Sequence, residues 1–230
     1  MRPWEILERE RAPEGGELTL YRRDDSFVIR VDGRELMSSR ASHSEEELAR
    51  LVIARLTPRP DLRVLVGGLG MGFTTRACLD ALPPGGQVVV AEIVPAVIRW
   101  NKGALAGLAK RPLDDPRTEV QLADVAEVIA SAKTRFDAIL LDVDNGPEGL
   151  TRKANQLLYN EHGLSAAKRI LRPGGLLAVW SAGPDAAFER RLRKVGFATE
   201  TVSMRSRGAA GGRMHTIFLA RVPDLLPSRS

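Results

Sequence analysis

The sequence predicts an α/β protein with a mostly parallel seven-stranded sheet, helices on both faces of that sheet and a small β-meander in front of it. Three observations predict this class. Five short apolar runs alternate with stretches of helical periodicity, and unbroken apolar runs are typical of parallel strands buried on both faces. A glycine-rich turn, Gly67–Gly72, follows the first run and precedes a helical stretch. Two more strand-like segments near the C-terminus complete the seven.

The expected elements follow from these runs. The apolar strands are Leu62–Val66, Val88–Ala91, Val120–Leu122, Ala138–Leu141 and Leu176–Trp180, followed by strands near 197–204 and 214–221. Helices are expected near 73–82, 94–109, 125–133, 154–171 and 185–195. The Arg205–Arg213 connection holds three glycines and is predicted to be a mobile loop.

The segment before the first apolar run has a different periodicity. Glu17–Arg22, Phe27–Val31 and Arg34–Met37 alternate like strands, and Asp32-Gly33 is a strong hairpin signal. We therefore expect a small β-meander domain over 1–43. The Ser44-x-x-Glu47 pattern predicts a capping box that opens a helix and a second domain over 44–222, with a tail over 223–230.

Composition excludes several classes of protein. The 230 residues are 43% hydrophobic and 27% charged, which excludes disorder and fibrous repeats. The single cysteine, Cys78, excludes an internal disulfide framework and a cysteine-based zinc cluster. No apolar run approaches the roughly 20 residues of a membrane helix, and the charged N-terminal stretch is unlike a signal peptide. We expect a soluble, cytoplasmic protein with no membrane partner.

The net charge of +5 raises the question of a nucleic-acid partner. The 28 Arg and 6 Lys residues are spread along the chain and form no basic block. An aromatic fraction of 5% leaves few side chains on which bases could stack. We therefore do not expect the protein to bind nucleic acid.

Glycine spacing indicates the kind of ligand. A dinucleotide fingerprint that starts at Gly68 would need a small residue at Phe73, so it fails. The spacing present, Gly68-x-Gly70-x-Gly72, is typical of S-adenosylmethionine sites. The alternative is a turn in which the glycines serve only tight packing.

Acidic residues follow three strands at the same predicted sheet edge. Glu92 ends the second strand, where it could accept both ribose hydroxyls, and Asp124 follows the third, where it could accept from an adenine amino group. Each could instead cap the next helix. Asp142 follows the fourth strand and could hold an amine or accept a proton. The Asp144–Pro147 stretch is favourable turn chemistry. The full predicted set of ligand-binding residues is Gly67, Gly68, Leu69, Gly70, Gly72, Glu92, Ile93, Asp124, Val125 and Asp142.

These motifs resemble the catalytic domain of spermidine synthases, a family related to class I S-adenosylmethionine-dependent methyltransferases. Two further stretches carry the resemblance, Leu158–Glu161 and Lys168–Gly175, which ends in Pro-Gly-Gly. The resemblance implies a Rossmann-like fold that binds decarboxylated S-adenosylmethionine or S-adenosylmethionine itself. It also makes Asp142 the first acid of the catalytic motif and places Tyr159 near the active site, with a core tyrosine as the alternative.

The sequence departs from the family at several positions. The second catalytic acid falls on Asn145, the acid of the glycine turn falls on Gly70, and a glutamine falls on Trp180. The tyrosine of the family's Tyr-His-Glu element falls near Ser42, although His43 remains as a candidate catalytic residue. A surface or capping histidine is the alternative for His43.

The departures set the order of the functional hypotheses. Binding a cationic polyamine requires several carboxylates to offset desolvation, and two are missing. Methyl transfer from S-adenosylmethionine to a small-molecule acceptor therefore ranks first. One alternative is aminopropyl transfer (polyamine or spermidine synthesis) from decarboxylated S-adenosylmethionine, with Asp144 replacing the absent acid. Another is a non-catalytic nucleoside-binding homologue.

The sequence also bears on metal binding and on oligomeric state. His162 and His215 have no metal-ligand spacing with carboxylates, so no metal is expected. The resemblance to an oligomeric family leaves open that a second copy of this chain is a partner, in a homodimer.

Overall fold

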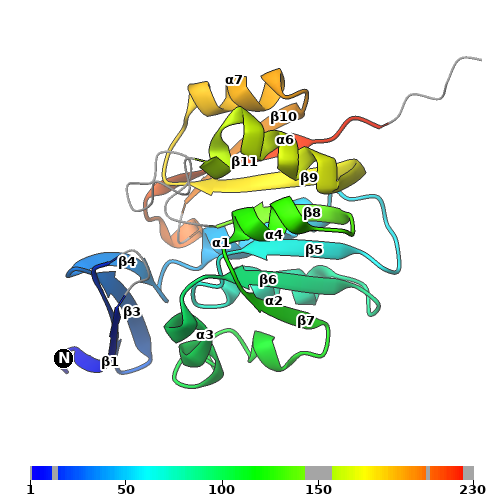
Figure 1. Cartoon of the computed structure of the whole chain (residues 1–230). Coiled ribbons are helices and arrows are strands. Elements are labelled where there is room, and N and C mark those ends of the chain that lie inside the picture. Colours follow the sequence, from blue (N-terminus) through cyan, green and yellow to red (C-terminus); the bar gives the residue numbers. More distant parts are fainter. Residues whose placement is uncertain (1, 12–14, 143–156, 206–207, 225–230) are drawn as a thin grey trace, which may run out of the picture.

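The computed structural model describes residues 2–11, 15–142, 157–205 and 208–224. A large sheet with helices on both faces forms the main body, and a small sheet lies beside the end of the body where the parallel strands finish (Figure 1). The strands are β1 Glu5–Arg11, β2 Glu17–Arg23, β3 Ser26–Val31, β4 Arg34–Ser38, β5 Arg63–Gly67, β6 Gln87–Glu92, β7 Thr118–Leu122, β8 Phe136–Leu141, β9 Leu171–Ser181, β10 Ala198–Arg205 and β11 Met214–Arg221. The helices are α1 His43–Ile53, α2 Phe73–Ala81, α3 Pro95–Lys102, α4 Val125–Ser131, α6 Glu161–Ile170 and α7 Ala186–Lys194, with 3₁₀ turns η1 Pro112–Asp114 and η2 Gly208–Ala210.

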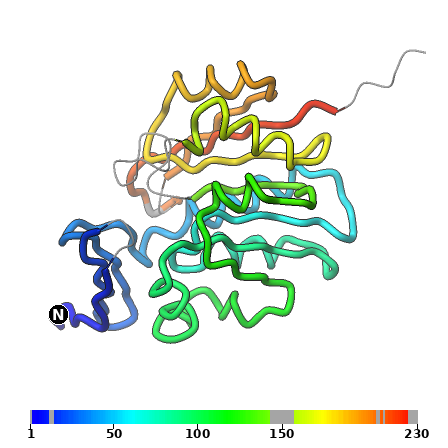
Figure 2. The backbone as a smooth tube through the Cα atoms, viewed as in Figure 1, coloured from blue at the N-terminus to red at the C-terminus, as the bar shows by residue number. Residues whose placement is uncertain are grey.

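The large sheet has seven strands in the order β10-β11-β9-β8-β5-β6-β7. Strands β9, β8, β5, β6 and β7 run parallel, and β11 runs antiparallel to both β9 and β10. The tube in Figure 2 follows the chain from β5 outward to β7 and then back across the sheet through β8 to β9. The predicted α/β class with a mostly parallel seven-stranded sheet is confirmed.

Both faces of the large sheet are buried, which explains the unbroken apolar strands. In β5, Val64 and Val66 pack in the core that contains α1, α2 and α3. Leu65, between them, packs in the opposite core with α4, α6 and α7. Successive side chains of a strand point to opposite faces, so a strand covered on both sides is apolar at every position.

The small sheet has four antiparallel strands in the order β1-β2-β3-β4. Asp32 and Gly33 both have positive φ, 47° and 78°, as the primed turn of a tight hairpin requires. The sequence predicted three of the four strands and missed β1. The charged composition of β1, Glu-Ile-Leu-Glu-Arg-Glu-Arg, hides its strand periodicity, and the strand forms because β2 offers it a paired edge.

The small sheet shares its core with the large sheet. Leu20 and Ile29, both fully buried, belong to the same apolar cluster as Leu48 of α1 and Val64 of β5. One continuous core therefore lies on both sides of residue 43. The predicted division of the chain into two domains at that residue stays a prediction.

Three helical predictions differ from the structure. The helix expected over 154–171 does not run through Asn160, whose extended backbone (φ −79°, ψ 172°) makes it the N-cap of α6, with its side chain accepting from the Gly163 N–H. The helix expected over 94–109 ends at Lys102, because Gly103 adopts a non-helical backbone (φ −113°, ψ −108°) and tight turns follow. The predicted Ser44 capping box is wrong. Helix α1 begins at His43 with Ser42 as its N-cap residue, so Ser44 lies inside the first turn. No helix among the described residues is long and apolar enough to span a membrane.

Strand β9 begins earlier than its apolar run. The predicted strand started at Leu176, but Leu171 already pairs with Phe136 of β8, and an irregularity in register follows before Leu176 pairs with Ala138. Gly174, with φ of 74°, lies in this irregular stretch and donates its N–H to the Val222 carbonyl. The Pro-Gly-Gly segment is thus part of the strand rather than a loop before it.

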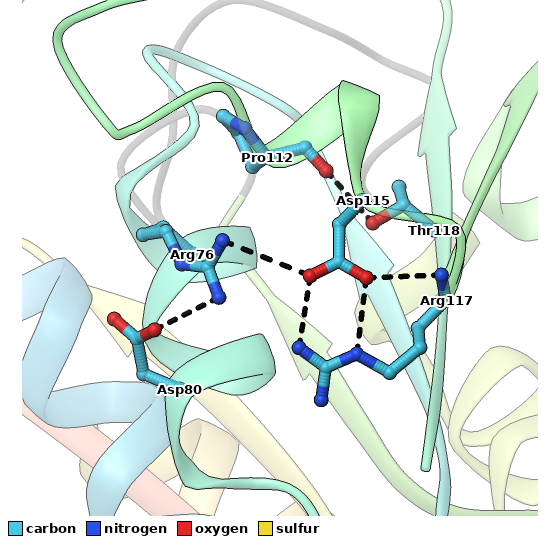
Figure 3. A network of polar contacts seen from close by, with 6 residues as sticks. All are labelled: Arg76, Asp80, Pro112, Asp115, Arg117 and Thr118. Atoms are coloured by element: carbon cyan, nitrogen blue, oxygen red, sulfur yellow. Dashed lines mark hydrogen bonds and ion pairs between the residues drawn. The ribbon is translucent and has the colours of Figure 1, made fainter. Parts of the chain in front are cut away.

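A polar network fixes helix α2 against the start of β7 (Figure 3). Asp115 accepts bonds from the Arg117 side chain at 2.8 and 3.0 Å and from the Arg117 N–H at 3.0 Å. Arg76 of α2 lies 3.8 Å from Asp115 and 2.8 Å from Asp80. These contacts hold the helix that follows the glycine turn in a fixed position over the sheet.

Candidate active site

The glycine turn lies where β5 passes into α2. Gly68, Gly70 and Gly72 have φ values of 87°, 54° and 86°, a left-handed backbone conformation that residues other than glycine rarely adopt. A Cβ on Gly72 would lie 2.9 Å from the Asn101 side-chain oxygen. Glycine at position 72 therefore lets the turn pack closely against Asn101 of α3, at the edge of the sheet where ligands of this fold collect.

Asn101 of α3 supports this turn, and no pattern in the sequence pointed to it. Its side-chain nitrogen donates to the Gly70 carbonyl at 2.8 Å and to the Val97 carbonyl at 2.9 Å. The side chain is 1% exposed. From the small sheet, the Met37 sulfur lies 3.6 Å from the position that a Cβ on Gly70 would take. Residues from two distant segments thus enclose the turn.

Glu92 lies beside the glycine turn, at the end of β6. Its two carboxylate oxygens accept from the Leu69 N–H at 3.0 Å and from the Val94 N–H at 2.8 Å. The side chain is buried, and Ile93 next to it is half-buried. The carboxylate therefore joins the turn to the segment after β6, and its role toward a ribose stays a prediction.

Asp124 caps helix α4, as its alternative interpretation proposed. One carboxylate oxygen accepts from the Ala126 N–H at 2.8 Å. Val125 packs on the start of the glycine turn, where a Cβ on Gly67 would come within 2.8 Å of the valine side chain. Asp124 and Val125 thus lie next to the turn, and the adenine contact stays a prediction.

Asp142 stands at the carboxyl end of β8, directly beside β5. Its N–H donates to the Gly67 carbonyl at 3.0 Å, and its carboxylate accepts from the Thr74 hydroxyl at 3.0 Å. Burial raises the pKa of Asp142 to about 6, against the opposing effect of the Thr74 bond. A carboxylate whose pKa lies near neutral is suited to accept a proton in catalysis.

A second acidic residue, Glu45, lies close to Asp142 and was not among the predicted site residues. The Thr74 hydroxyl that donates to the Asp142 carboxylate is 3.4 Å from the Glu45 main-chain carbonyl. Burial raises the pKa of Glu45 well above its usual value, and the charges of Asp142 and then Glu46 raise it further. Glu45 lies in the first turn of α1, far from Asp142 in the sequence. The nearby His43 was the available signal, but nothing in the sequence distinguished Glu45 from its acidic neighbours.

The first turn of α1 also contacts the end of the sheet formed by β9 and β11. The Ser44 hydroxyl lies 3.0 Å from Nδ1 of His215, whose ring meets Trp180 edge-on with centroids 4.5 Å apart. Nε2 of His43 lies 3.0 Å from the position of a Cβ on Gly208. His43 therefore lies against the Arg205–Arg213 connection, part of which is outside the described residues. Burial lowers the pKa of His215.

Tyr159 packs in the core on the face of α4, α6 and α7. It is 3% exposed, and its ring meets Phe188 edge-on at 5.6 Å. This placement agrees with the core alternative, and the catalytic role stays untested. Asp144 and Asn145 lie outside the described residues. Within the described ranges, no three or more His, Cys, Asp or Glu side chains form a group able to hold a metal ion.

Comparisons with known proteins agree on one family. A model described as the spermine/spermidine synthase domain matches residues 46–189. A polyamine aminopropyltransferase of Mycobacterium tuberculosis is 27% identical over 223 residues, which cover 92% of this chain and 40% of that protein. One from Prochlorococcus marinus is 33% identical over 125 residues, or 54% of this chain and 42% of that protein. The chain thus spans about two fifths of the length of these relatives.

Solved structures share the fold. The spermidine synthase of Thermotoga maritima matches with a TM-score of 0.73 at 22% identity, over 94% of this chain and 72% of that one. A spermidine synthase in complex with a transition-state analogue matches with a TM-score of 0.72. Since the family model matches more than half of the chain, from α1 into α7, the protein belongs to the spermine/spermidine synthase domain family.

Proposed function

We propose that the protein is an aminopropyltransferase, which transfers the aminopropyl group of decarboxylated S-adenosylmethionine to an amine acceptor. The observation that carries this proposal is Asp142, a carboxylate of raised pKa beside the glycine turn. The names of the curated relatives support aminopropyl transfer over the methyl transfer that the sequence ranked first.

The residues around the turn fit a nucleoside sulfonium. The positive φ values of Gly68, Gly70 and Gly72 suit a turn without side chains, which would allow the backbone to approach a ligand closely. We assign Glu92 to the ribose and Asp124 to the adenine edge, because Glu92 ends β6, which pairs with β5, and Asp124 follows β7, the next strand outward. Gly67, Leu69, Ile93 and Val125 would complete the walls of this part of the site.

Asp142 would act on the acceptor. An ammonium group cannot attack until it loses a proton, and Asp142 can take that proton because burial favours its neutral form. The sulfonium supplies a carbon that is already electrophilic. The acceptor nitrogen forms a bond to this carbon, the carbon–sulfur bond breaks with its electron pair going to sulfur, and methylthioadenosine leaves. The protein's main task is to align the two reactants.

Methyl transfer from S-adenosylmethionine is the second candidate. The observation that favours it is the absence of a carboxylate at Gly70, where the family's glycine turn carries an acid that serves the amine groups. A nucleoside-binding protein without catalysis is the third, and it would bind the ligands without converting them.

Calorimetric titration of the purified protein tests the proposal. We expect tighter binding of decarboxylated S-adenosylmethionine and methylthioadenosine than of S-adenosylmethionine and its demethylated product. The reverse order would overturn aminopropyl transfer in favour of methyl transfer. No binding of any of the four would leave the fold without a sulfonium ligand. Glu92→Gln should weaken the binding of all four ligands, and unchanged affinity would show that Glu92 does not contact the ribose.

A further inference from the structure

The side-chain amide of Asn101 makes an incomplete set of hydrogen bonds beside the glycine turn. Its nitrogen donates to the Gly70 and Val97 carbonyls at 2.8 and 2.9 Å. Because both partners are acceptors, the nitrogen must face them, which fixes the orientation of the amide. The remaining atom, Oδ1, is buried and has no hydrogen-bond partner in the part of the chain that the structure describes. It lies 2.9 Å from the position that a Cβ on Gly72 would take.

This set of contacts adds little to the stability of the fold. A buried acceptor without a donor costs about as much free energy as one or two neutral hydrogen bonds contribute, so the unpaired Oδ1 offsets the two bonds of the nitrogen. Gly70 is half-buried, and its carbonyl could bond to water if Asn101 were replaced. An apolar side chain of similar size would therefore stabilise α3 about as well. What it would not do is hold the Gly70 carbonyl in one place.

The turn needs an outside contact because its own residues do not select one conformation. Four of the six residues from 67 to 72 are glycine, which populates positive and negative φ about equally. The Gly72 N–H closes the turn by donating to the Leu69 carbonyl at 2.9 Å, and Gly70 lies between them with φ of 54°. Without the bond from Asn101, a ligand would have to order this segment when it binds.

Helix α3 is a fixed base for the contact. Trp100 is 2% exposed and Asn101 is 1% exposed, so this turn of the helix is packed in the protein interior. On the solvent side, Arg99 pairs with Glu8 and Glu10 of β1, each at 2.7 Å. The position of Asn101 is thus set independently of the glycine turn, and its amide can select the conformation of the turn rather than follow it.

We propose that Asn101 is a positioning residue for the adenosyl ligand, which holds the glycine turn in its binding conformation before the ligand arrives. A turn that is already ordered loses less conformational entropy on binding, and the Kd is lower for that reason. This inference rests on the glycine turn being the ligand site of the proposed function, and it deepens that function. It makes a residue outside the turn a determinant of the affinity.

Three variants of the full chain test this role. Asn101→Leu removes the amide and keeps a side chain of similar size. Asn101→Ser keeps a hydroxyl that can bond to the Val97 carbonyl four residues earlier but is too short to reach Gly70. Arg99→Ala is the matched control, since it loosens the same helix from β1 without changing the contact to the turn. Methylthioadenosine is titrated calorimetrically into each protein, and NMR follows hydrogen exchange of the Gly72 amide with and without this ligand.

We expect both Asn101 variants to raise the Kd for methylthioadenosine about tenfold, while their thermal unfolding stays close to that of wild type. Exchange of the Gly72 amide should accelerate in the ligand-free variants, because this amide is protected only while the turn is closed. Saturating methylthioadenosine should slow it again, and the Leu65 amide in β5 should not change. In Arg99→Ala the Kd should stay within about twofold of wild type, since exposed ion pairs contribute little.

Two results would overturn the positioning role. One is a wild-type Kd and wild-type exchange at Gly72 in both Asn101 variants. The other is an equal rise in Kd in Arg99→Ala, which would assign the effect to the attachment of α3 rather than to the bond with Gly70.

The design separates this inference from the proposed function. If the wild type forms no aminopropylated product, yet binds methylthioadenosine with an affinity that both Asn101 variants lose, the reaction fails and the positioning role stands. If the wild type turns over and both variants bind with its Kd, the reaction stands and the positioning role fails. A wild type that binds no adenosyl ligand would overturn both.

Discussion

The surroundings of two aspartates in this chain shift their pKa values in opposite directions. Burial raises the pKa of Asp142 to about 6, while the Arg117 side chain lowers the pKa of Asp115 to about 2. A carboxyl group whose pKa is raised by folding lowers the stability of the protein when it is ionised. A carboxyl group whose pKa is lowered by a cationic partner raises that stability. The first pattern is typical of functional sites, and the second is typical of structural ion pairs.

Asp142→Asn should abolish turnover and stabilise the ligand-free protein. Between about pH 4 and pH 6 the folded state binds more protons at Asp142 than the unfolded chain, so ionisation lowers stability as pH rises through this window. Removing the charge should add about 1–3 kcal/mol to the free energy of unfolding above pH 6. Urea unfolding at pH 4 and pH 7.5, compared with wild type, measures this difference. Equal stability of the two proteins at pH 7.5 would mean that Asp142 is well hydrated.

Asp115→Asn should act in the opposite direction. The lowered pKa of Asp115 contributes stability that is present above about pH 4 and is lost as pH falls toward 2. The variant should lose about 2 kcal/mol at pH 7, and this difference should shrink in acid. Chemical denaturation over a pH series checks it, with the exposed Asp61→Asn as control. A loss that does not depend on pH would assign the effect to packing rather than to charge.

At the scale of elements, the glycine turn, α3 and β4 form one unit. Asn101 holds the Gly70 carbonyl, and Met37 covers the same glycine from the small sheet. The position of the turn therefore depends on a helix and a strand that are distant from it in sequence. This dependence explains why the motif alone indicates a ligand without fixing the shape of its site.

Gly72→Ala should damage both folding and ligand binding. The residue has φ of 86°, and a Cβ there would lie 2.9 Å from the Asn101 side-chain oxygen and 3.0 Å from Pro112. We expect a loss of about 1–3 kcal/mol of stability and weaker binding of methylthioadenosine. Gly107→Ala is the matched control, because a Cβ there meets nothing within 4 Å. Thermal unfolding and calorimetry would contradict the prediction if the two variants behaved alike.

The sequence predicted the elements whose signal is local. Continuous apolar runs predicted the parallel strands, and Asp32-Gly33 predicted its hairpin, because burial on two faces and a primed turn each leave a mark on neighbouring residues. Strand β1 was missed because its stability comes from pairing with β2 rather than from its charged side chains. The capping box at Ser44 was wrong because the Ser44 hydroxyl lies against His215 from a distant strand.

For the whole molecule, one apolar core connects the small sheet to the large one. Leu20 and Ile29 lie in the same cluster as residues of α1, α2 and β5. Four antiparallel strands that share a core with their neighbour are expected to unfold together with it. The small sheet then acts as a fixed wall of the candidate site.

Cys78 provides a probe of this cooperativity. It is fully buried in the shared core, and burial raises the pKa of its thiol to about 12, so the folded protein should not react with thiol reagents. Ile29→Ala in the small sheet should cost about 2–5 kcal/mol and accelerate labelling of Cys78 in proportion. Labelling that stays slow while the small sheet loses its structure would show that the two sheets unfold separately.

The composition of the candidate site was only partly visible in the sequence. Strand ends in a parallel sheet share one edge, so Glu92, Asp124 and Asp142 could be placed beside the glycine turn from order alone. Glu45, Thr74 and Asn101 could not, because their contribution depends on how α1, α2 and α3 pack over that edge. The motif predicted Tyr159 near the active site, with a core tyrosine as the alternative; its ring packs against Phe188, and its catalytic role stays a prediction.

The most direct test of the proposed aminopropyl transfer is mass analysis of the products formed from decarboxylated S-adenosylmethionine and diaminobutane. Wild type should form methylthioadenosine and an aminopropylated diamine in equal amounts, and Asp142→Asn should form neither product. Consumption of S-adenosylmethionine with a methylated product, and no reaction of the decarboxylated form, would contradict the account.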